Sequence, residues 1–154
     1  MSEHLRSPEP ETSRATPDDP GRSHVLIVDD HAPSRRICAS YCDLFDHTTQ
    51  LAAGPGEAIA ALKRERFHAV VMSVHMAQAS TLETLRAIRE LPAPAGETPV
   101  IGLTALGRGE EAQRWLGAGF AGVLAKPITA ARLYAALSMV IDRDDEARAW
   151  MATD

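Results

Sequence analysis

The chain has 154 residues, of which 45% are apolar and 24% charged, and this composition predicts one folded globular domain with a short tail. Its formal net charge of −5 leaves no basic excess to neutralise phosphates, which argues against a nucleic-acid partner. No apolar stretch approaches the ~20 residues of a membrane span and the N-terminus lacks a secretory signal, so we expect a cytoplasmic protein with no membrane partner.

The N-terminal residues 1–22 combine prolines with polar and charged side chains and offer almost nothing to bury, which predicts a disordered tail. Four apolar residues at 25–28 then predict a strand buried on both faces, as in a parallel sheet covered by helices. Asp29 and Asp30 follow, at the end where open α/β sheets bind ligands. Adjacent carboxylates repel each other by roughly 3 kcal/mol at ~5 Å and an effective dielectric of about 20, so the pair indicates a nearby cation, either a metal or a lysine.

Segments with the pattern of a strand and of a helix alternate five times. The predicted strands are 24–29, 48–51, 69–74, 99–104 and 122–125. Between them, apolar residues recur every three or four positions, which predicts helices. The residues expected to face inward are Ile37, Tyr41, Leu44 and Phe45 in the first helix, Ala58, Ile59 and Leu62 in the second (57–66), Leu82, Leu85, Ile88 and Leu91 in the third, and Leu133, Leu137 and Val140 in the last. The fourth helix is predicted over 109–116, and Thr129 is the expected N-cap of the last. This alternation is typical of a parallel sheet between two layers of helices.

Two cysteines, Cys38 and Cys42, lie four residues apart in the first predicted helix. That geometry does not suit a disulfide. We therefore expect reduced thiols in the core rather than a metal or redox pair.

A charged extension over residues 142–154 ends the chain. Ala147, Trp150 and Met151 fall at helical spacing, so the segment either prolongs the last helix and docks its apolar edge or is a frayed end. The 13 residues that follow Ile141 are too few for a DNA-binding or catalytic output domain, so none is expected here.

Several motifs occur in the order of a known family. Asp29 and Asp30 after the first strand, Thr104 at the end of the fourth, and Lys126 with Pro127 after the fifth resemble the receiver domain of two-component response regulators (CheY-like), over 23–141. The resemblance implies an α/β flavodoxin-like fold, a doubly wound five-stranded parallel sheet of order 2-1-3-4-5 with five helices. It also implies that the acidic pair holds Mg²⁺ and that an Asp ending the third strand accepts a phosphoryl group from a phosphohistidine. In the family, the Thr and Lys bind the phosphoryl oxygens and an aromatic residue on the fifth strand moves with the Thr.

This sequence departs from the family pattern at the phosphoacceptor. The acceptor position falls on Ser73, and the switch aromatic is Val123. The loop after Ser73 has also lost its signature, with Ala77 at the proline position and Ser80–Thr81 in place of Asp-Gly. A serine hydroxyl is barely ionised at neutral pH and is a poor nucleophile without a base or a metal. We interpret the chain as a natural degenerate pseudo-receiver, not an enzyme, without a catalytic residue.

The same substitution weakens the predicted metal site. Mg²⁺ usually relies on one or two carboxylates, so Asp29 and Asp30 are expected to bind it weakly at best, and no cofactor is expected. Lys126 is instead expected to reach one or both carboxylates and hold the pocket in one state. A less favoured alternative is a transition-metal site made by His31 and His75 with Asp30.

Three functional hypotheses follow. The favoured one is a phosphorylation-independent protein-interaction module that binds a histidine kinase or an output protein, or forms a homodimer, through the face of helix four, strand five and helix five. Trp115, Val123 and Tyr134 are its candidate contacts. The alternatives are a sensor of a nucleotide second messenger, with Arg108 and Arg114 as phosphate ligands, and a receiver phosphorylated at a non-standard residue. A flavodoxin-type enzyme is excluded because Asp29 and Asp30 stand where that fold holds phosphate.

Overall fold

Five parallel strands form a single sheet in the computed structural model, which describes residues 23–77, 79–105 and 110–152, with side chains to residue 141. The strands are β1 (His24–Val28), β2 (Thr48–Ala52), β3 (Ala69–Ser73), β4 (Val100–Thr104) and β5 (Gly122–Ala125). They pair in the order β2-β1-β3-β4-β5, which confirms the predicted topology. The helices are α1 (Ala32–Leu44), α2 (Pro55–Arg64), α3 (Thr81–Arg89), the 3-10 helix η2 (Ala95–Glu97), α4 (Glu110–Ala118) and α5 (Ala130–Ala152).

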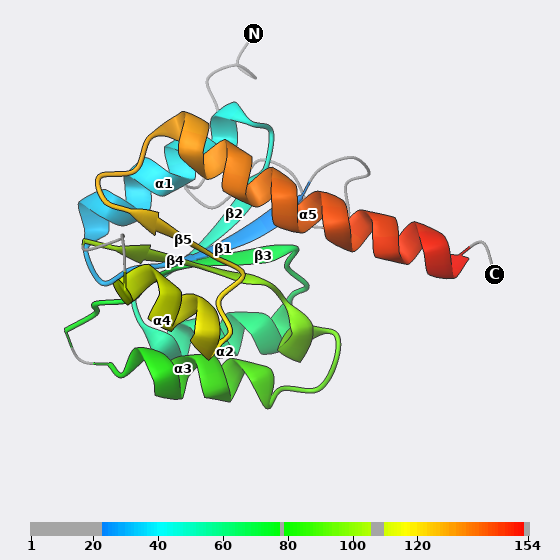
Figure 1. Ribbon diagram of the computed structural model, residues 1–154, viewed down its shortest axis with the longest axis horizontal. Coiled ribbons are helices and arrows are strands. Elements are labelled where there is room, and N and C mark those ends of the chain that lie inside the picture. The colour runs from blue at the N-terminus through cyan, green and yellow to red at the C-terminus, as the bar shows by residue number, and fades with distance from the viewer. Residues whose placement is uncertain (1–22, 78, 106–109, 153–154) are drawn as a thin grey trace, which may run out of the picture.

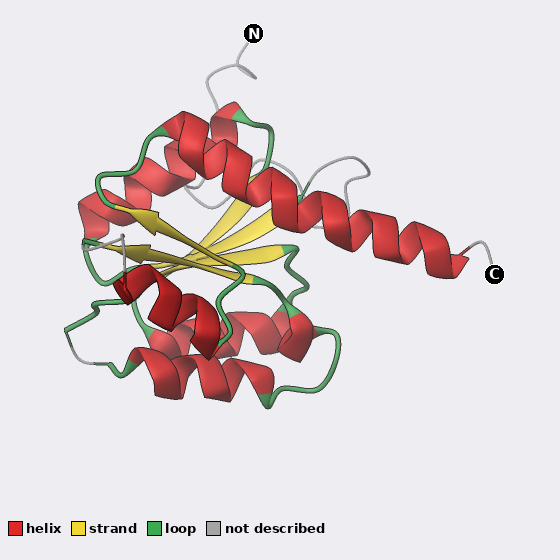
Figure 2. Cartoon of the chain, viewed as in Figure 1, coloured by secondary structure: helices red, strands yellow, loops and turns green. Residues whose placement is uncertain are grey.

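Helices cover both faces of the sheet, with α1 and α5 on one side and α2, α3 and α4 on the other (Figures 1 and 2). Successive residues of β1 point to opposite faces, so Val25 and Ile27 join the core under α1 and α5 while Leu26 and Val28 join the core under α2 and α3. All four are fully buried, as the uninterrupted apolar run predicted. Burying such a side chain contributes about 1.5–3 kcal/mol, so β1 anchors both layers.

The predicted inward faces of two helices are wrong in part. In α1 the buried residues are Cys38 and Cys42, while Ile37 is 49% and Leu44 73% exposed. Cys38 and Cys42 are four residues apart and therefore share the face of α1 that is buried, while Ile37 and Leu44 lie outside that face. The prediction that both cysteines are free, buried thiols is confirmed.

In α3 the error concerns Leu82, which is 49% exposed, whereas Thr81 and Thr84 are buried. Both threonines satisfy their hydroxyls on backbone carbonyls, Thr81 on Val74 and Thr84 on Ser80 at 2.8 Å, so they can face the core. Leu85 and Ile88 are buried as predicted, and Leu91 lies beyond the end of the helix.

Element boundaries differ from the prediction where the chain carries turn residues. The helix predicted over 57–66 begins earlier, with Gly54 as N-cap and Pro55 in its first turn. Thr129 is the N-cap of α5 as expected, since its Oγ1 accepts a hydrogen bond from the backbone N–H of Arg132 at 3.2 Å. The inward positions of α5 are also confirmed, because Leu133, Leu137 and Val140 are buried.

Helix α5 continues to Ala152 and extends past the sheet (Figure 1). The alternative of a prolonged last helix is therefore correct for the backbone, while docking of Ala147, Trp150 and Met151 concerns side chains outside those described. The predicted tail, 1–22, also lies outside the described residues. Among the helices that are described, none is both long and apolar enough to cross a membrane.

Candidate functional site

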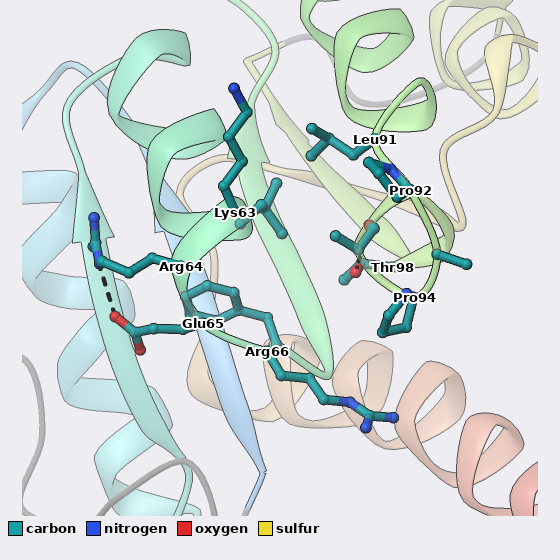
Figure 3. A pocket seen from close by; sticks show the side chains of 12 residues that line it. Lys63, Arg64, Glu65, Arg66, Leu91, Pro92, Pro94 and Thr98 are labelled. Atoms are coloured by element: carbon teal, nitrogen blue, oxygen red, sulfur yellow. Dashed lines mark hydrogen bonds and ion pairs between the residues drawn. The ribbon is translucent and has the colours of Figure 1, made fainter.

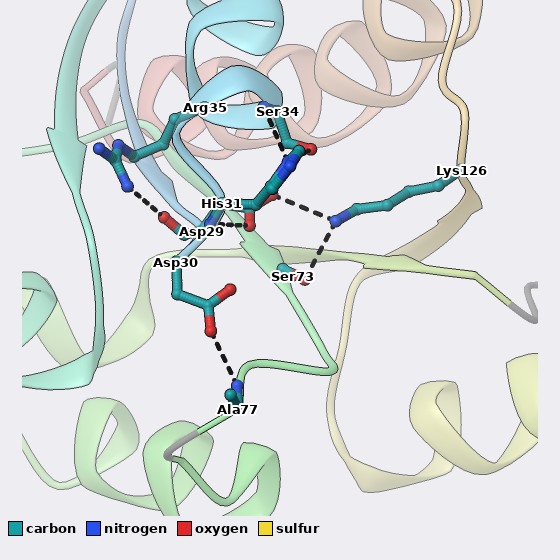
Figure 4. Close-up of polar contacts among 8 residues, drawn as sticks. All are labelled: Asp29, Asp30, His31, Ser34, Arg35, Ser73, Ala77 and Lys126. Carbon is teal, nitrogen blue, oxygen red and sulfur yellow. Dashed lines mark hydrogen bonds and ion pairs between the residues drawn. The ribbon is translucent and has the colours of Figure 1, made fainter.

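The predicted polar residues meet at one edge of the sheet. Asp29 follows β1, Ser73 ends β3, Thr104 ends β4 and Lys126 follows β5. Because all strands are parallel, these positions share the carboxyl edge, where open α/β sheets bind ligands. The close-up in Figure 4 shows the Lys126 side chain reaching across this edge toward Asp29 and Ser73.

Asp29 is the most enclosed charge of the site, with 1% of its side chain exposed. Its Oδ1 accepts a hydrogen bond from the His31 backbone N–H at 3.0 Å, and its Oδ2 lies 3.2 Å from Lys126 Nζ. Arg35 donates to the Asp29 carbonyl at 2.8 Å. A buried carboxylate needs such partners because an unpaired charge is costly away from water. Lys126 therefore supplies the cation that the sequence led us to expect.

Ser73 lies against the same lysine. Ser73 is a buried residue with 3% of its surface exposed, and Lys126 Nζ donates a hydrogen bond to Ser73 Oγ at 3.3 Å. The ammonium group thus bridges the ends of β1 and β3. We expected Lys126 to reach one or both of the carboxylates, and in the structure it contacts one of them, that of Asp29.

Asp30 turns away from this bridge toward solvent. Its Oδ2 accepts a hydrogen bond from the Ala77 backbone N–H at 2.8 Å, which links the loop after β1 to the loop after β3 (Figure 4). The two adjacent carboxylates therefore relieve their repulsion in different ways, one by an ion pair and one by exposure and a backbone donor.

A second network lies on the α4 side of the edge, and sequence reasoning missed one of its members. His75 Nε2 lies 3.1 Å from Thr104 Oγ1 and 3.1 Å from Glu111 Oε2. Trp115 Nε1 donates to the same Glu111 oxygen at 3.0 Å. A ring nitrogen that faces a carboxylate oxygen must carry its proton, so His75 is the donor in this pair. Glu111 and Trp115 are four residues apart in α4, a spacing that could have suggested the contact.

The transition-metal alternative fails on geometry. His31 acts as the N-cap of α1, where its Nδ1 accepts from the Ser34 backbone N–H at 3.3 Å and lies 2.9 Å from Ser34 Oγ. His75 is engaged with α4 instead. Within the described part of the chain, no three His, Cys, Asp or Glu side chains are grouped to hold a metal ion.

Comparison with known proteins decides the family. A family model for the response regulator receiver domain matches residues 25–138. The chain belongs to this family. A receiver domain is a module of two-component signal transduction, so the chain is a receiver in such a system.

The relatives found by sequence include proteins named as sensor histidine kinases. The chain is 32% identical over 149 residues to the sensor histidine kinase RcsC of Salmonella typhi, covering 96% of this chain and 15% of the relative. It is 36% identical over 128 residues to the virulence sensor protein BvgS of Bordetella pertussis, covering 79% of this chain and 10% of the relative. The chain thus spans only a small part of the curated relatives it matches.

Solved receivers share the fold. The chemotaxis response regulator CheY4 of Vibrio cholerae superposes with a TM-score of 0.70 at 27% identity, over 77% of this chain and 98% of that one. The receiver domain of the sensor histidine kinase PA1611 from Pseudomonas aeruginosa has a TM-score of 0.70 at 24% identity, over 79% and 99%. That receiver was solved with a magnesium ion coordinated in its active site cleft.

Several of the oxygens that could hold Mg²⁺ in the receiver described here already have partners. Both oxygens of Asp29 are engaged, one of them by an ammonium group. Asp30 has one oxygen on Ala77, and Ser73 contributes a neutral hydroxyl. Mg²⁺ prefers oxygen ligands in near-octahedral geometry, and at this edge Lys126 pairs with one of the two candidate carboxylates, Asp29.

The residues expected at an interface do not form one patch. Trp115 and Val123 are half-buried and pack on the core beneath α2 and α3, with Trp115 edge-on to Phe120 at 5.8 Å between ring centroids. Tyr134 is 51% exposed and lies against Phe45 at the end of α1, at 4.8 Å. Arg114 is exposed on α4, whereas Arg108 lies outside the described residues.

Proposed function

We propose that this receiver accepts no phosphoryl group and signals by binding other proteins. The observation that carries the proposal is the contact of Ser73 with Lys126 at the end of β3, where the family resemblance puts the phosphoacceptor. An alcohol at this position provides no carboxylate to form an acyl phosphate. The site would then be a static ionic cluster rather than a switch.

The surroundings of Ser73 support this proposal. A serine becomes a nucleophile when an adjacent base removes its proton. The group that hydrogen-bonds Ser73 Oγ is the Lys126 ammonium, which is paired with the buried Asp29 and cannot act as a base while it stays protonated. No described residue hydrogen-bonds the Ser73 hydroxyl as a base would.

The test is phosphorylation in vitro. The chain is incubated with acetyl phosphate or phosphoramidate and Mg²⁺, and its intact mass is measured. We expect no added phosphoryl group in the wild type and none in Ser73→Ala. Ser73→Asp restores a carboxylate at the same position and is the matched variant that should gain mass.

The competing hypothesis of a non-standard phosphorylation site gives a different result. Transfer of label from a phosphorylated histidine kinase that persists in Ser73→Ala and disappears in Asp29→Asn or Asp30→Asn would contradict our proposal. It would mean that a neighbouring acid had become the acceptor. Label that disappears in Ser73→Ala would contradict it as well.

We also propose that the partner binds the face of α4, β5 and α5. All four residues of the edge strand β5 are only half-buried, and Leu116 and Met139 are 43% and 59% exposed, which leaves apolar surface for a partner. The sequence relatives named as sensor histidine kinases make a kinase or an output protein the expected partner, and a homodimer is a further candidate. We propose neither enzymatic activity nor nucleic-acid binding.

Pull-down from the parent cell tests this surface. Leu116→Glu and Met139→Glu should abolish capture, while Leu82→Glu, an equally exposed leucine on α3, should not. If Leu116→Glu and Met139→Glu still capture the partner, the interface lies on another face of the domain.

A further inference from the structure

A pocket lies at the opposite edge of the sheet from Asp29 and Ser73. Its volume is about 360 Å³, and it opens between the segment that precedes β3 and the segment that precedes β4 (Figure 3). Its twelve lining residues are Leu62, Lys63, Arg64, Glu65, Arg66, Phe67, Leu91, Pro92, Ala93, Pro94, Ala95 and Thr98.

The wall that precedes β4 is held rigidly. Arg89 donates from one nitrogen to the carbonyls of Gly96 at 3.0 Å and Thr98 at 2.8 Å. A Cβ at Gly96 would lie 2.1 Å from the Leu91 carbonyl oxygen, so the turn can close this tightly only with glycine. Because the turn is fixed by these contacts, Leu91, Pro92 and Pro94 present an apolar surface that is formed before any ligand arrives.

The opposite wall is fixed as well. Glu65 Oε1 lies 2.8 Å from the buried His24 Nε2, and the ring of Phe67 stacks on His24 at 4.6 Å with an angle of 8° between the planes. These contacts tie the end of α2 to the first residue of β1. The pocket therefore lies between two constrained walls, which reduces the entropy lost when a ligand binds.

Two cations on this wall are available to a ligand. Lys63 and Arg66 extend from it toward opposite ends of the pocket (Figure 3), and neither side chain makes an ion pair or a hydrogen bond with any other described residue. Arg64 turns toward Glu65, at 3.6 Å, and Glu65 is the one acidic residue among the twelve that line the pocket. Its charge is shared by His24 and Arg64, so the pocket is positive in a chain whose net charge is −5.

We propose that this pocket binds a small organic phosphate with a flat apolar body, of the size of a nucleoside monophosphate. The volume is at the lower end of the range of about 300–1,000 Å³ for ligand sites, which suits one nucleotide rather than a dinucleotide. The phosphate binds at one end of the pocket, to either Lys63 or Arg66, because ammonium and guanidinium groups form strong hydrogen bonds with its oxygens. The ring packs on Leu91, Pro92 and Pro94. This site is distinct from the arginines of α4 that the sequence suggested.

Titration of the full chain, followed by amide chemical shifts and by calorimetry, tests the proposal. The probes are AMP, GMP, CMP and inorganic phosphate. We expect at least one nucleotide to bind with a sub-millimolar Kd and to shift the signals of residues 62–67 and 91–98. Inorganic phosphate should bind at least about tenfold more weakly, because it lacks the apolar body.

Two charge variants locate the site. Lys63→Gln with Arg66→Gln should weaken nucleotide binding at least about tenfold. The matched control, Arg86→Gln with Arg132→Gln, removes the same charge from exposed positions of α3 and α5 and should leave the affinity unchanged. Ala93→Trp fills the pocket without a change in charge and should also abolish binding.

Several results would overturn the inference. These are the absence of sub-millimolar binding by every nucleotide, equal affinity for inorganic phosphate, and binding that persists in the Lys63 and Arg66 double variant. Amide chemical-shift changes confined to the edge of the sheet that carries Asp29 and Ser73 would also contradict the inference. The phosphorylation assay reads the other edge of the sheet, so failure of one proposal leaves the other intact.

Discussion

At the scale of single residues, Lys126 determines what the acidic edge can do. Its ammonium group pairs with Asp29 and donates to Ser73, and so it bridges the ends of β1 and β3.

This arrangement predicts a weak response to Mg²⁺. A ligand present at its Kd stabilises a protein by RT ln 2, about 0.4 kcal/mol, so we expect millimolar Mg²⁺ to raise the free energy of unfolding of the wild type by no more than this. Ser73→Asp should raise the gain severalfold because it adds a carboxylate ligand. Urea denaturation with and without Mg²⁺ measures both, and Asp29→Asn in the Ser73→Asp background should remove the gain. A large stabilisation of the wild type would show that the lysine yields to the metal.

The two cysteines give a second prediction at this scale. Burial, reinforced by the negative charge of Asp29 at Cys38 and by Cys38 and Asp43 at Cys42, raises the pKa of each thiol from 9.0 to about 12. Since the thiolate is the reactive form, neither cysteine should react with a disulfide reagent at pH 8 until the chain unfolds. Reaction rates in buffer and in urea measure this, and fast labelling in buffer would contradict the buried placement. The same shift means that stability falls as the pH rises above 9, because only the unfolded chain then loses thiol protons.

At the scale of elements, strands were easier to predict than helix faces. The run at 25–28 is apolar without interruption, so its burial does not depend on register, and the five strands and their order were predicted from the sequence together with the family resemblance. The predicted helix faces were wrong where smaller or polar residues are buried in place of large apolar ones. Thr81 and Thr84 can be buried because their hydroxyls donate hydrogen bonds to backbone carbonyls. The spacing of apolar residues cannot predict the burial of such polar side chains. The contact of Glu111 with His75 joins residues 36 apart, which spacing cannot reveal.

That contact makes a prediction about α4. None of the described side chains of this helix is fully buried, so the contacts of Glu111 with His75 and Trp115 add to the packing of Trp115 on the core in attaching it. Glu111→Ala should speed amide hydrogen exchange in α4 about tenfold and cost about 1–2 kcal/mol of unfolding free energy, since a hydrogen bond to a charged group contributes about 1.5–3 kcal/mol. Exchange followed by mass spectrometry measures this. Glu110→Ala, an exposed change in the same turn, is the control, and equal effects of the two would show that the network does not hold the helix.

At the scale of the whole molecule, a histidine at the amino edge makes folding sensitive to acid. Burial lowers the pKa of His47 below its ordinary value of 6.5, and the proximity of His68 lowers it further, while Asp46 acts in the opposite direction. Among the described residues, no group hydrogen-bonds its buried Nε2.

The sign of the effect follows from linkage. The folded state resists protonation of His47, whereas the unfolded chain takes up the proton near pH 6.5, so this residue lowers stability as the pH falls below about 6.5. Urea unfolding between pH 7.5 and 5.5 should therefore lose less stability in His47→Gln than in the wild type. His31→Asn keeps the cap of α1 and removes only an exposed imidazole, so its curve should parallel that of the wild type. Parallel curves for His47→Gln would contradict the prediction.

The length of α5 has a mechanical consequence. The last described side chain of the helix, Ile141, is buried, and the backbone stays helical to Ala152, about 16 Å farther along the axis at 1.5 Å per residue. A rod clamped at one end amplifies any tilt of its base, so a rotation of about 10° at Ile141 would sweep the far tip by roughly 3 Å. A movement of the sheet that tilts the base of α5 only slightly would therefore displace the C-terminal end of the helix by a larger distance, and a partner bound at that end would be displaced with it.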